Sequence, residues 1–157
     1  MWSVYLLLSV SLLLFCFPGL VVWPANSCLN FLGDFITDRL HSSQYYFRVF
    51  TNNVTPSSTS ILTDFTEAAW GGYSPILGSS VTWGAPALAG VTAGTTGSNL
   101  VFNNTTGSAV TLYGVYVTDG SIATKLYFCE RDANAPVSVP AGGSYIYTPN
   151  QQFRSMN

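Results

Sequence analysis

Residues 109–149 read AVTLYGVYVTDGSIATKLYFCERDANAPVSVPAGGSYIYTP, and they carry the clearest β-strand signal in this chain. Three runs rich in Val, Tyr, Thr and Phe are separated there by Gly, Pro and Asp, which favour turns. Because β-branched and aromatic residues prefer extended backbone, this arrangement predicts antiparallel strands joined by short connections. We therefore expect a mainly β domain built around this stretch.

The strand pattern also extends toward the N-terminus of that stretch. Residues 44–51 alternate, with Tyr45, Phe47 and Val49 on one face of a predicted strand. Further short strands are predicted at 74–77, 81–83, 87–93, 100–103, 110–118, 125–131, 137–139 and 144–148. Short strands separated by recurring turn signals favour an antiparallel β-sandwich or jelly roll.

The predicted strand at 110–118 is apolar or aromatic on both of its faces. One face carries Val110, Leu112 and Tyr116, and the other carries Tyr113, Val115 and Val117. Such a strand is either interior to the domain or covered by a partner, and the interior position is favoured.

The N-terminal part of the chain differs from the rest. No charged residue precedes Asp34, and residues 4–23 form an apolar run long enough to cross a bilayer as a helix. For residues 1–25 three interpretations stay open: a secretory signal, a membrane anchor, or the product of an upstream start codon. Residues 26–157 make up a single domain. It begins with a short amphipathic helix at 28–41, predicted from apolar residues spaced three and four apart.

Composition restricts the function classes. Only 8% of the 157 residues are charged, against about 25% in average soluble domains, while 48% are hydrophobic. The surface must therefore be covered largely by uncharged Ser, Thr, Asn, Gly and Tyr, which suits lasting contacts with neighbouring proteins. The five basic residues are scattered and the net charge is −2, so no cluster can neutralise several phosphates, and direct nucleic-acid binding is not expected.

Residues suited to catalysis or metal binding are sparse. His41 is the sole histidine, and no pair of cysteines has the C-x-x-C spacing of a zinc site. Outside the leader the cysteines are Cys28 and Cys129, for which buried thiols are favoured over a disulfide. We therefore expect no catalytic residue, no cofactor and no metal, and the protein is predicted not to be an enzyme.

The acidic residues allow structural interpretations. Asp64 and Glu67 are placed to form a carboxylate pair for a cation or for acid–base chemistry, but a helix-capping role at a brief helical turn is favoured. Asp119-Gly120 predicts a hairpin connection in which the glycine takes a positive φ. The run at 130–132, Glu-Arg-Asp, is interpreted as an ion-paired strand end that faces water.

Aromatic side chains near glycines supply the candidate interaction surface. Trp70 and Tyr73 flank Gly71-Gly72, and Trp83 precedes Gly84. Rings carried on loops can stack on a sugar or on a neighbouring subunit, whereas the alternative is ordinary filling of the core. The sequence therefore names Trp70, Tyr73 and Trp83 as a possible interaction surface and leaves both alternatives open.

Several blocks resemble a family of small, mostly uncharacterised bacteriophage and environmental-virus proteins. These blocks are FTNNVTP at 50–56, DFTEA at 64–68 with Gly72-Tyr73 after it, YGVYVTD at 113–119, and Glu130-Arg131 followed by AGG at 141–143 and Thr148-Pro149. They occur in the order of the family over residues 29–149. The resemblance implies a virion component with no catalytic residue or defined ligand, although the apolar leader departs from the family pattern.

These observations favour a non-enzymatic structural protein of a phage particle, associated with the capsid or the tail. Its expected partners are other virion proteins and further copies of itself, as a homo-oligomer. One alternative is a secreted or surface-anchored β-sandwich module for adhesion or glycan binding. Another is a membrane-anchored protein, which requires that residues 4–23 are retained.

Overall fold

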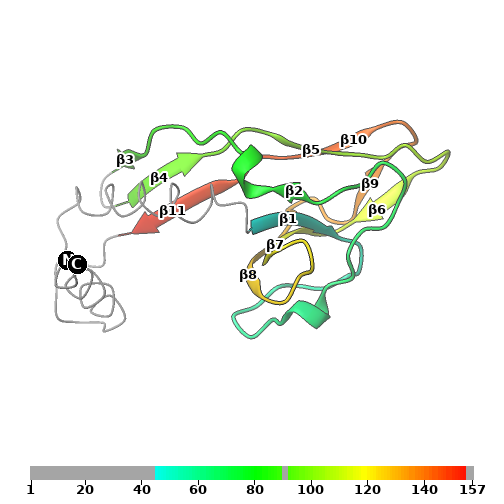
Figure 1. Ribbon diagram of the computed structural model, residues 1–157, viewed down its shortest axis with the longest axis horizontal. Helices are drawn as coiled ribbons and strands as arrows, with labels where there is room; N and C mark the ends of the chain where they lie inside the picture. Colours follow the sequence, from blue (N-terminus) through cyan, green and yellow to red (C-terminus); the bar gives the residue numbers. More distant parts are fainter. Residues whose placement is uncertain (1–44, 90–91, 155–157) are drawn as a thin grey trace.

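The computed structural model describes residues 45–89 and 92–154, which form a mainly antiparallel β fold (Figure 1). The leader at 1–25, the run at 4–23, the helix at 28–41 and Cys28 lie outside the described residues. Within the described ranges, helical structure is limited to the 3₁₀ turns η3 (Leu62–Asp64) and η4 (Gly78–Ser80). None of the helices in this part of the chain has the length and hydropathy to span a bilayer.

Four strands form the largest sheet, in the order β2-β1-β7-β8. Their bounds are β1 (Tyr45–Phe50), β2 (Ile76–Leu77), β7 (Gly114–Asp119) and β8 (Leu126–Arg131). β1 and β7 pair along their whole lengths, from Tyr45 opposite Asp119 to Phe50 opposite Gly114. β7 is thus flanked on both edges, which confirms the predicted interior position for this part of the 110–118 stretch.

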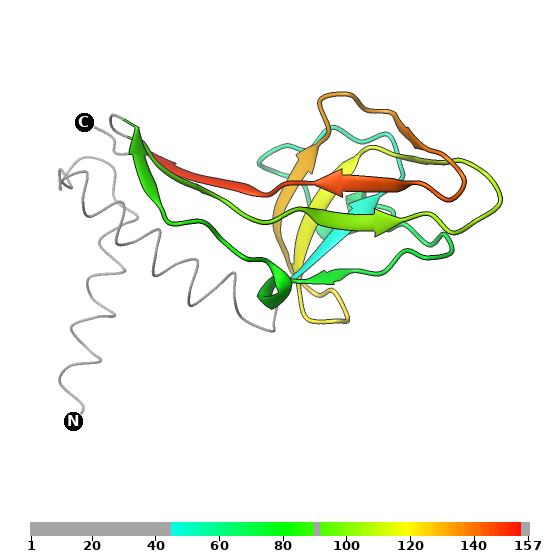
Figure 2. The same ribbon diagram turned by 90° about the horizontal axis from the view of Figure 1, so that it is seen from above.

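The remaining strands form three small sheets. They are β3 (Ala87–Ala89), β4 (Thr92–Thr96) and β11 (Asn150–Arg154) in the order β11-β4-β3, then β5 (Leu100–Asn103) with β10 (Ser144–Tyr147), and β6 (Val110–Leu112) with β9 (Val137–Val139). β4 leads into β5 while β10 leads into β11, so the two pairs continue one another as a long two-stranded ribbon (Figure 2). β3 lies at the far end of this ribbon, away from the main body.

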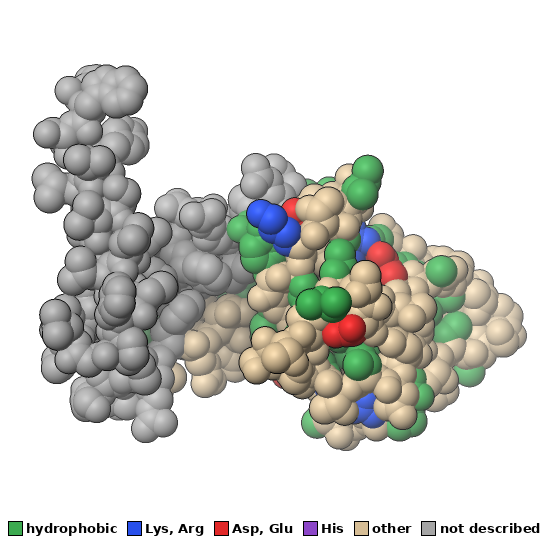
Figure 3. All heavy atoms as spheres, turned by 90° about the horizontal axis from the view of Figure 1, so that it is seen from below, with side chains coloured by type: hydrophobic (Ala, Val, Ile, Leu, Met, Phe, Trp, Pro, Cys, Tyr) green, Lys and Arg blue, Asp and Glu red, His purple; other side chains and the backbone are tan. Residues whose placement is uncertain are grey.

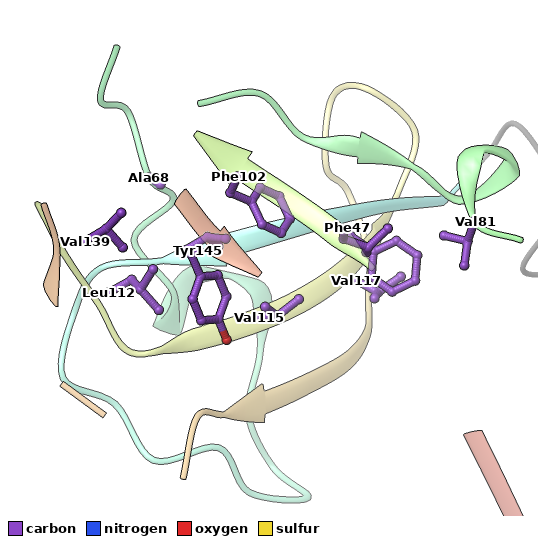
Figure 4. Close-up of a cluster of buried hydrophobic side chains, with 11 residues drawn as sticks. Phe47, Ala68, Val81, Phe102, Leu112, Val115, Val117, Val139 and Tyr145 are labelled. Atoms are coloured by element: carbon purple, nitrogen blue, oxygen red, sulfur yellow. The ribbon is translucent and has the colours of Figure 1, made fainter. Parts of the chain in front are cut away.

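The main core lies between the four-stranded sheet and the pair β5 and β10. Phe47 and Val49 of β1 meet Val115 and Val117 of β7 there, and Phe102 and Tyr145 enter from β5 and β10 (Figure 4). Val81, beside η4, closes one end of this cluster, whereas Leu112 and Val139 lie at the other end (Figure 4). Alternation along β1 therefore directs Phe47 and Val49 into this core, as the sequence predicts.

The opposite face of the four-stranded sheet is covered by a second cluster. It consists of Phe50, Phe65 and Tyr116, which are buried, with the partly buried Val54, Leu62, Tyr113, Leu126 and Cys129. The Phe50 and Phe65 rings meet edge to face at 5.0 Å, and Phe65 stacks on Tyr116 at 5.4 Å. Both faces of β7 are thus buried, which agrees with its apolar composition.

Several predicted strands have different bounds in the structure. The strand predicted at 110–118 is divided into β6 and β7, and the strand predicted at 87–93 is divided into β3 and β4, which pair with each other. Residues 81–83 contribute only one isolated bridge, from Trp83 to Gly97, and 74–77 is shortened to β2. β11 was not predicted.

The break between β6 and β7 changes which residues share a face. Val110 and Leu112 lie with Val115 and Val117 in the main core, whereas Tyr113 and Tyr116 belong to the second cluster. The predicted grouping of Leu112 with Tyr116 was therefore wrong. Tyr113 leaves the alternation because its N–H donates to the Phe50 carbonyl and its carbonyl accepts from the Asp132 N–H.

Candidate functional site

Trp70 and Tyr73 lie together at a tight turn a few residues after Phe65 of the second cluster. Gly72 has φ 85°, a conformation that favours glycine, and the turn closes with the Tyr73 N–H donating to the Trp70 carbonyl at 3.2 Å. The two rings meet edge to face at 5.3 Å. Trp70 donates its indole N–H to the Asn103 carbonyl, and Tyr73 stacks on Phe102 at 5.9 Å. Both side chains are partly buried and pack against the main core.

The Tyr73 hydroxyl connects this aromatic pair to a polar network. It donates to Glu67 Oε1 at 2.9 Å and accepts the backbone N–H of Val49 at 3.2 Å. Burial raises the pKa of Tyr73 well above its usual range, the hydrogen bond from the Val49 amide lowers it by a smaller amount, and the negative charge of Glu67 raises it again. Tyr73 therefore stays a neutral donor and satisfies a strand N–H that β2 does not reach.

Arg48 is the centre of the polar network. It lies in the middle of β1 and is only 4% exposed. Its Nη1 binds both carboxylate oxygens of Glu67, at 2.7 and 2.6 Å, and its Nε donates to Thr118 Oγ1 at 2.9 Å. Its Nη2 donates to the carbonyls of Gly120 and Ser121 in the turn after β7. A buried guanidinium needs such complete pairing, because an unpaired buried charge is costly.

Trp83 packs at a different place in the fold. It lies beside Gly97 through the isolated bridge, where a Cβ on Gly97 would stand 3.4 Å from the indole ring. The indole nitrogen is buried, and it has no acceptor within the described residues. The side chain is partly buried against the main core, as are Trp70 and Tyr73. The described ring contacts join Trp70 to Tyr73, and Trp83 takes part in none of them.

Every carboxylate in the described residues is engaged by the fold itself. Asp64 accepts the Ile61 N–H and so caps η3, the capping role that the sequence favours. The 3₁₀ turn lies one turn earlier in the chain than the helical turn that was predicted to begin at Asp64. Glu67 pairs with Arg48 rather than with Asp64. Asp119 accepts from Thr124 and Lys125 across the hairpin that starts at Gly120, whose φ is 53° as the sequence predicts.

The strand end at residues 130–132 was misinterpreted from the sequence as ion-paired. Glu130 accepts from the Tyr147 hydroxyl, and Asp132 accepts from the Tyr145 hydroxyl and the Asn134 N–H. Arg131 donates to the Val54 carbonyl at 2.9 Å and lies over the Tyr113 ring. The ion pair among the described side chains is Arg48 with Glu67. Tyrosine hydroxyls and a carbonyl have taken the places that charged partners were expected to fill.

No group of His, Cys, Asp or Glu in the described ranges is arranged to hold a metal ion. Cys129 is a free, partly buried thiol at the edge of the second cluster, and burial raises its pKa, with a further rise from the charge of Asp64. A thiol of this kind is a weak nucleophile, because the thiolate is the reactive form.

The Arg48–Glu67 pair is the feature that sequence reasoning missed. Arg48 lies in a strand that is rich in aromatic residues, and an arginine within an apolar strand indicates a buried partner.

Comparisons of this chain with models of protein families, with curated proteins and with solved structures find no match.

Proposed function

We propose that this protein is a non-enzymatic structural component of a phage particle, associated with the capsid or the tail and built on a β-sandwich or jelly-roll-like domain. The observation that carries the proposal is the distribution of charge and apolar surface. The carboxylates Asp64, Glu67, Asp119, Glu130 and Asp132 are all occupied by hydrogen bonds inside the fold. Side chains held in this way have structural roles, which supports a structural rather than a catalytic function.

The outer surface is neutral and carries exposed apolar side chains. On the face in Figure 3, uncharged polar side chains and backbone atoms predominate, with scattered hydrophobic groups and few charged ones. Val101 of β5 and Ile146 of β10 stand opposite each other in the register, and they are 46% and 57% exposed. An outward apolar pair on a neutral sheet supports contact with another protein, because its burial would remove apolar area from water without desolvating charges.

The ribbon formed by β4, β5, β10 and β11 gives further support. It extends from the main body, and among the described residues β3 and β11 are the outer strands of its three-stranded part (Figure 2). Unpaired edge groups are a common route to pairing with a neighbouring chain. Many copies in a particle would make individually weak contacts of this kind effective.

The proposal is tested by the assembly state of the full chain and by its presence in particles. We expect sedimentation and negative-stain microscopy of the purified protein to show a closed symmetric oligomer. The double variant Val101→Thr, Ile146→Thr should shift it toward smaller species. Ile61→Thr is the matched control, because Ile61 is a similarly exposed aliphatic residue in a loop.

A second measurement uses particles of the phage whose genome encodes the chain. Mass spectrometry of purified particles should find the protein at a fixed copy number. A chain that is monomeric at high concentration and missing from particles would contradict the proposal. Oligosaccharide binding that Trp70→Ala abolishes would favour the adhesion alternative instead.

A further inference from the structure

Residues 51–67, which we term the strap, lie across the four-stranded sheet on the face opposite the main core. The strap leaves the end of β1, contains η3, and returns to the sheet at the bridge between Glu67 and Phe50 (Figure 1). Its Val54, Leu62 and Phe65 side chains form the outer part of the second cluster. Phe50 and Tyr116, on the sheet, are buried beneath them.

Hydrogen bonds join the two ends of the strap, a region that we term its neck. There the Asn52 side chain donates to the Asp64 carbonyl at 2.7 Å and accepts the Thr66 N–H at 2.8 Å. The Thr51 N–H also donates to the Thr66 carbonyl at 2.9 Å. These bonds join the two ends of the loop to each other, so they can persist when the loop moves away from the sheet.

Two arginines of the sheet contact the strap. Arg48 of β1 binds the carboxylate of Glu67, at the end of the strap, and Arg131 of β8 donates to the Val54 carbonyl. The apolar residues beneath the strap make a cluster separate from the main core. Segments with a separate hydrophobic cluster and few connections open as local units without global unfolding.

We propose that the strap is a cover that opens as one unit, and that the two arginine contacts hold it shut over the aromatic face of β1 and β7. This inference goes beyond the proposed function and does not depend on it. In the open state the neck stays tied, whereas Phe50, Tyr116 and the Cys129 thiol become accessible. The device thereby controls the exposure of an uncharged aromatic surface.

Amide hydrogen exchange in the full chain tests this proposal. In Glu67→Gln, and separately in Arg131→Gln, exchange of the strap amides is expected to accelerate by about tenfold or more, the scale of losing one charge-assisted hydrogen bond. The amides of β5, β7 and β10 should remain slower than the strap amides in both variants, because they exchange only by global unfolding. Two variants are used because Glu67→Gln also leaves Arg48 with a neutral partner, whereas Arg131→Gln leaves the Arg48 contact intact and removes the bond to Val54 together with the contact on the Tyr113 ring.

Val139→Ala is the control, because Val139 is a fully buried member of the main core and its loss destabilises the whole domain without touching the strap. It should accelerate the sheet amides, which exchange by global unfolding, and leave the strap amides, which exchange by local opening, little changed. If Val139→Ala accelerates the strap as strongly as Glu67→Gln does, at matched stability in urea, the strap opens only by global unfolding and the proposal fails.

Alkylation of Cys129, followed by peptide mapping that separates it from Cys16 and Cys28, gives an independent readout. Cys129 is partly buried against the second cluster, so opening of the strap should increase its labelling rate. A faster rate in Glu67→Gln and in Arg131→Gln, but not in Val139→Ala, supports the proposal. Equal rates in all three variants and in the unchanged protein would overturn it.

Discussion

The Arg48 guanidinium and the Glu67 carboxylate form an ion pair that joins the middle of β1 to the end of the strap, with Arg48 Nη1 contacting both carboxylate oxygens. The Arg48 side chain is 5% exposed and that of Glu67 is 33% exposed, so the positive partner is the buried one. Its remaining donors reach Thr118 and the hairpin carbonyls of Gly120 and Ser121. One side chain therefore connects β1, the strap and the turn between β7 and β8.

Glu67→Gln is expected to lower the free energy of unfolding by about 2–3 kcal/mol. Breaking a fully buried pair costs about 3–5 kcal/mol, and the partial exposure of Glu67 reduces that figure. The double variant Arg48→Met, Glu67→Gln should cost less than the sum of the two single variants, because the orphaned charge is removed. Urea denaturation measures all three. Loss of under about 0.5 kcal/mol in Glu67→Gln would show that the pair behaves like a surface salt bridge.

Three glycines differ in what a side chain would meet at their positions: a steric clash, an unfavourable backbone conformation, or neither. A Cβ at Gly114 would lie 2.1 Å from the Glu130 carbonyl oxygen and 2.8 Å from the Phe50 ring, so Gly114→Ala should cost about 3 kcal/mol or more. Gly142 has open space but φ 70°, and Gly142→Ala should cost about 1 kcal/mol. Gly107 has neither constraint, and Gly107→Ala should stay within about 0.5 kcal/mol. Thermal unfolding of the series checks this order, which equal losses at all three positions would contradict.

The strands whose alternation is set by local sequence were predicted well. β5 and β9 have the predicted bounds, and β1 and β8 differ from theirs by a residue or two at their ends. β5 and β9 bury alternate side chains, so a period of two is visible in their sequences. The mainly β fold therefore follows from propensity and turn chemistry.

The features that the sequence missed depend on contacts between distant segments. β6 and β7 are divided at Tyr113, whose backbone bonds go to Phe50 and Asp132, residues distant in the sequence. β11 begins with Asn and Gln, which are poor strand formers, and it is extended because it pairs with β4. Arg48 and Glu67 are nineteen residues apart, and only the folding back of the strap brings them together.

The hairpin after β7 makes the protein sensitive to acid through Asp119. The hydroxyl and backbone N–H of Thr124, followed by the Lys125 N–H, hold the pKa of Asp119 below its usual value. A carboxyl group whose pKa is lower in the folded state stabilises the fold above its unfolded pKa of about 3.9 and loses that contribution as the pH falls through the folded value. The carboxyl chemical shift of Asp119 should therefore titrate at lower pH in the native protein than in urea.

Thr124→Val is the matched variant for that titration, because it keeps the shape and the backbone donor but removes the hydroxyl. The pKa of Asp119 should rise toward its ordinary value in this variant, since the hydroxyl is the largest cause of the lowering. In Asp119→Asn the stability should vary less with pH below about pH 4. An Asp119 titration that is the same in Thr124→Val and in the unchanged chain would contradict this interpretation of the hairpin.

Buried tyrosines make the protein sensitive to alkali in turn. Burial raises the pKa of Tyr147 and Tyr145 well above the ordinary range, and so does the negative charge of their carboxylate partners, Glu130 and Asp132. A group whose pKa is raised by folding contributes its full stability below the unfolded value of about 10, and the contribution is lost as the pH rises above it. Titration of tyrosine absorbance should therefore show an early phase near pH 10 and a late phase that coincides with unfolding.

The variant Glu130→Gln tests how much of the late tyrosine titration comes from Tyr147. It removes the charge next to Tyr147 and leaves the surroundings of Tyr73 unchanged, because Tyr73 is paired with Glu67. In ring-labelled protein followed by NMR, the Tyr147 signal should titrate at lower pH in Glu130→Gln, while the Tyr73 signal stays in place. If both signals move together, ionisation follows global unfolding, and the carboxylate next to each hydroxyl has no separate effect on its pKa.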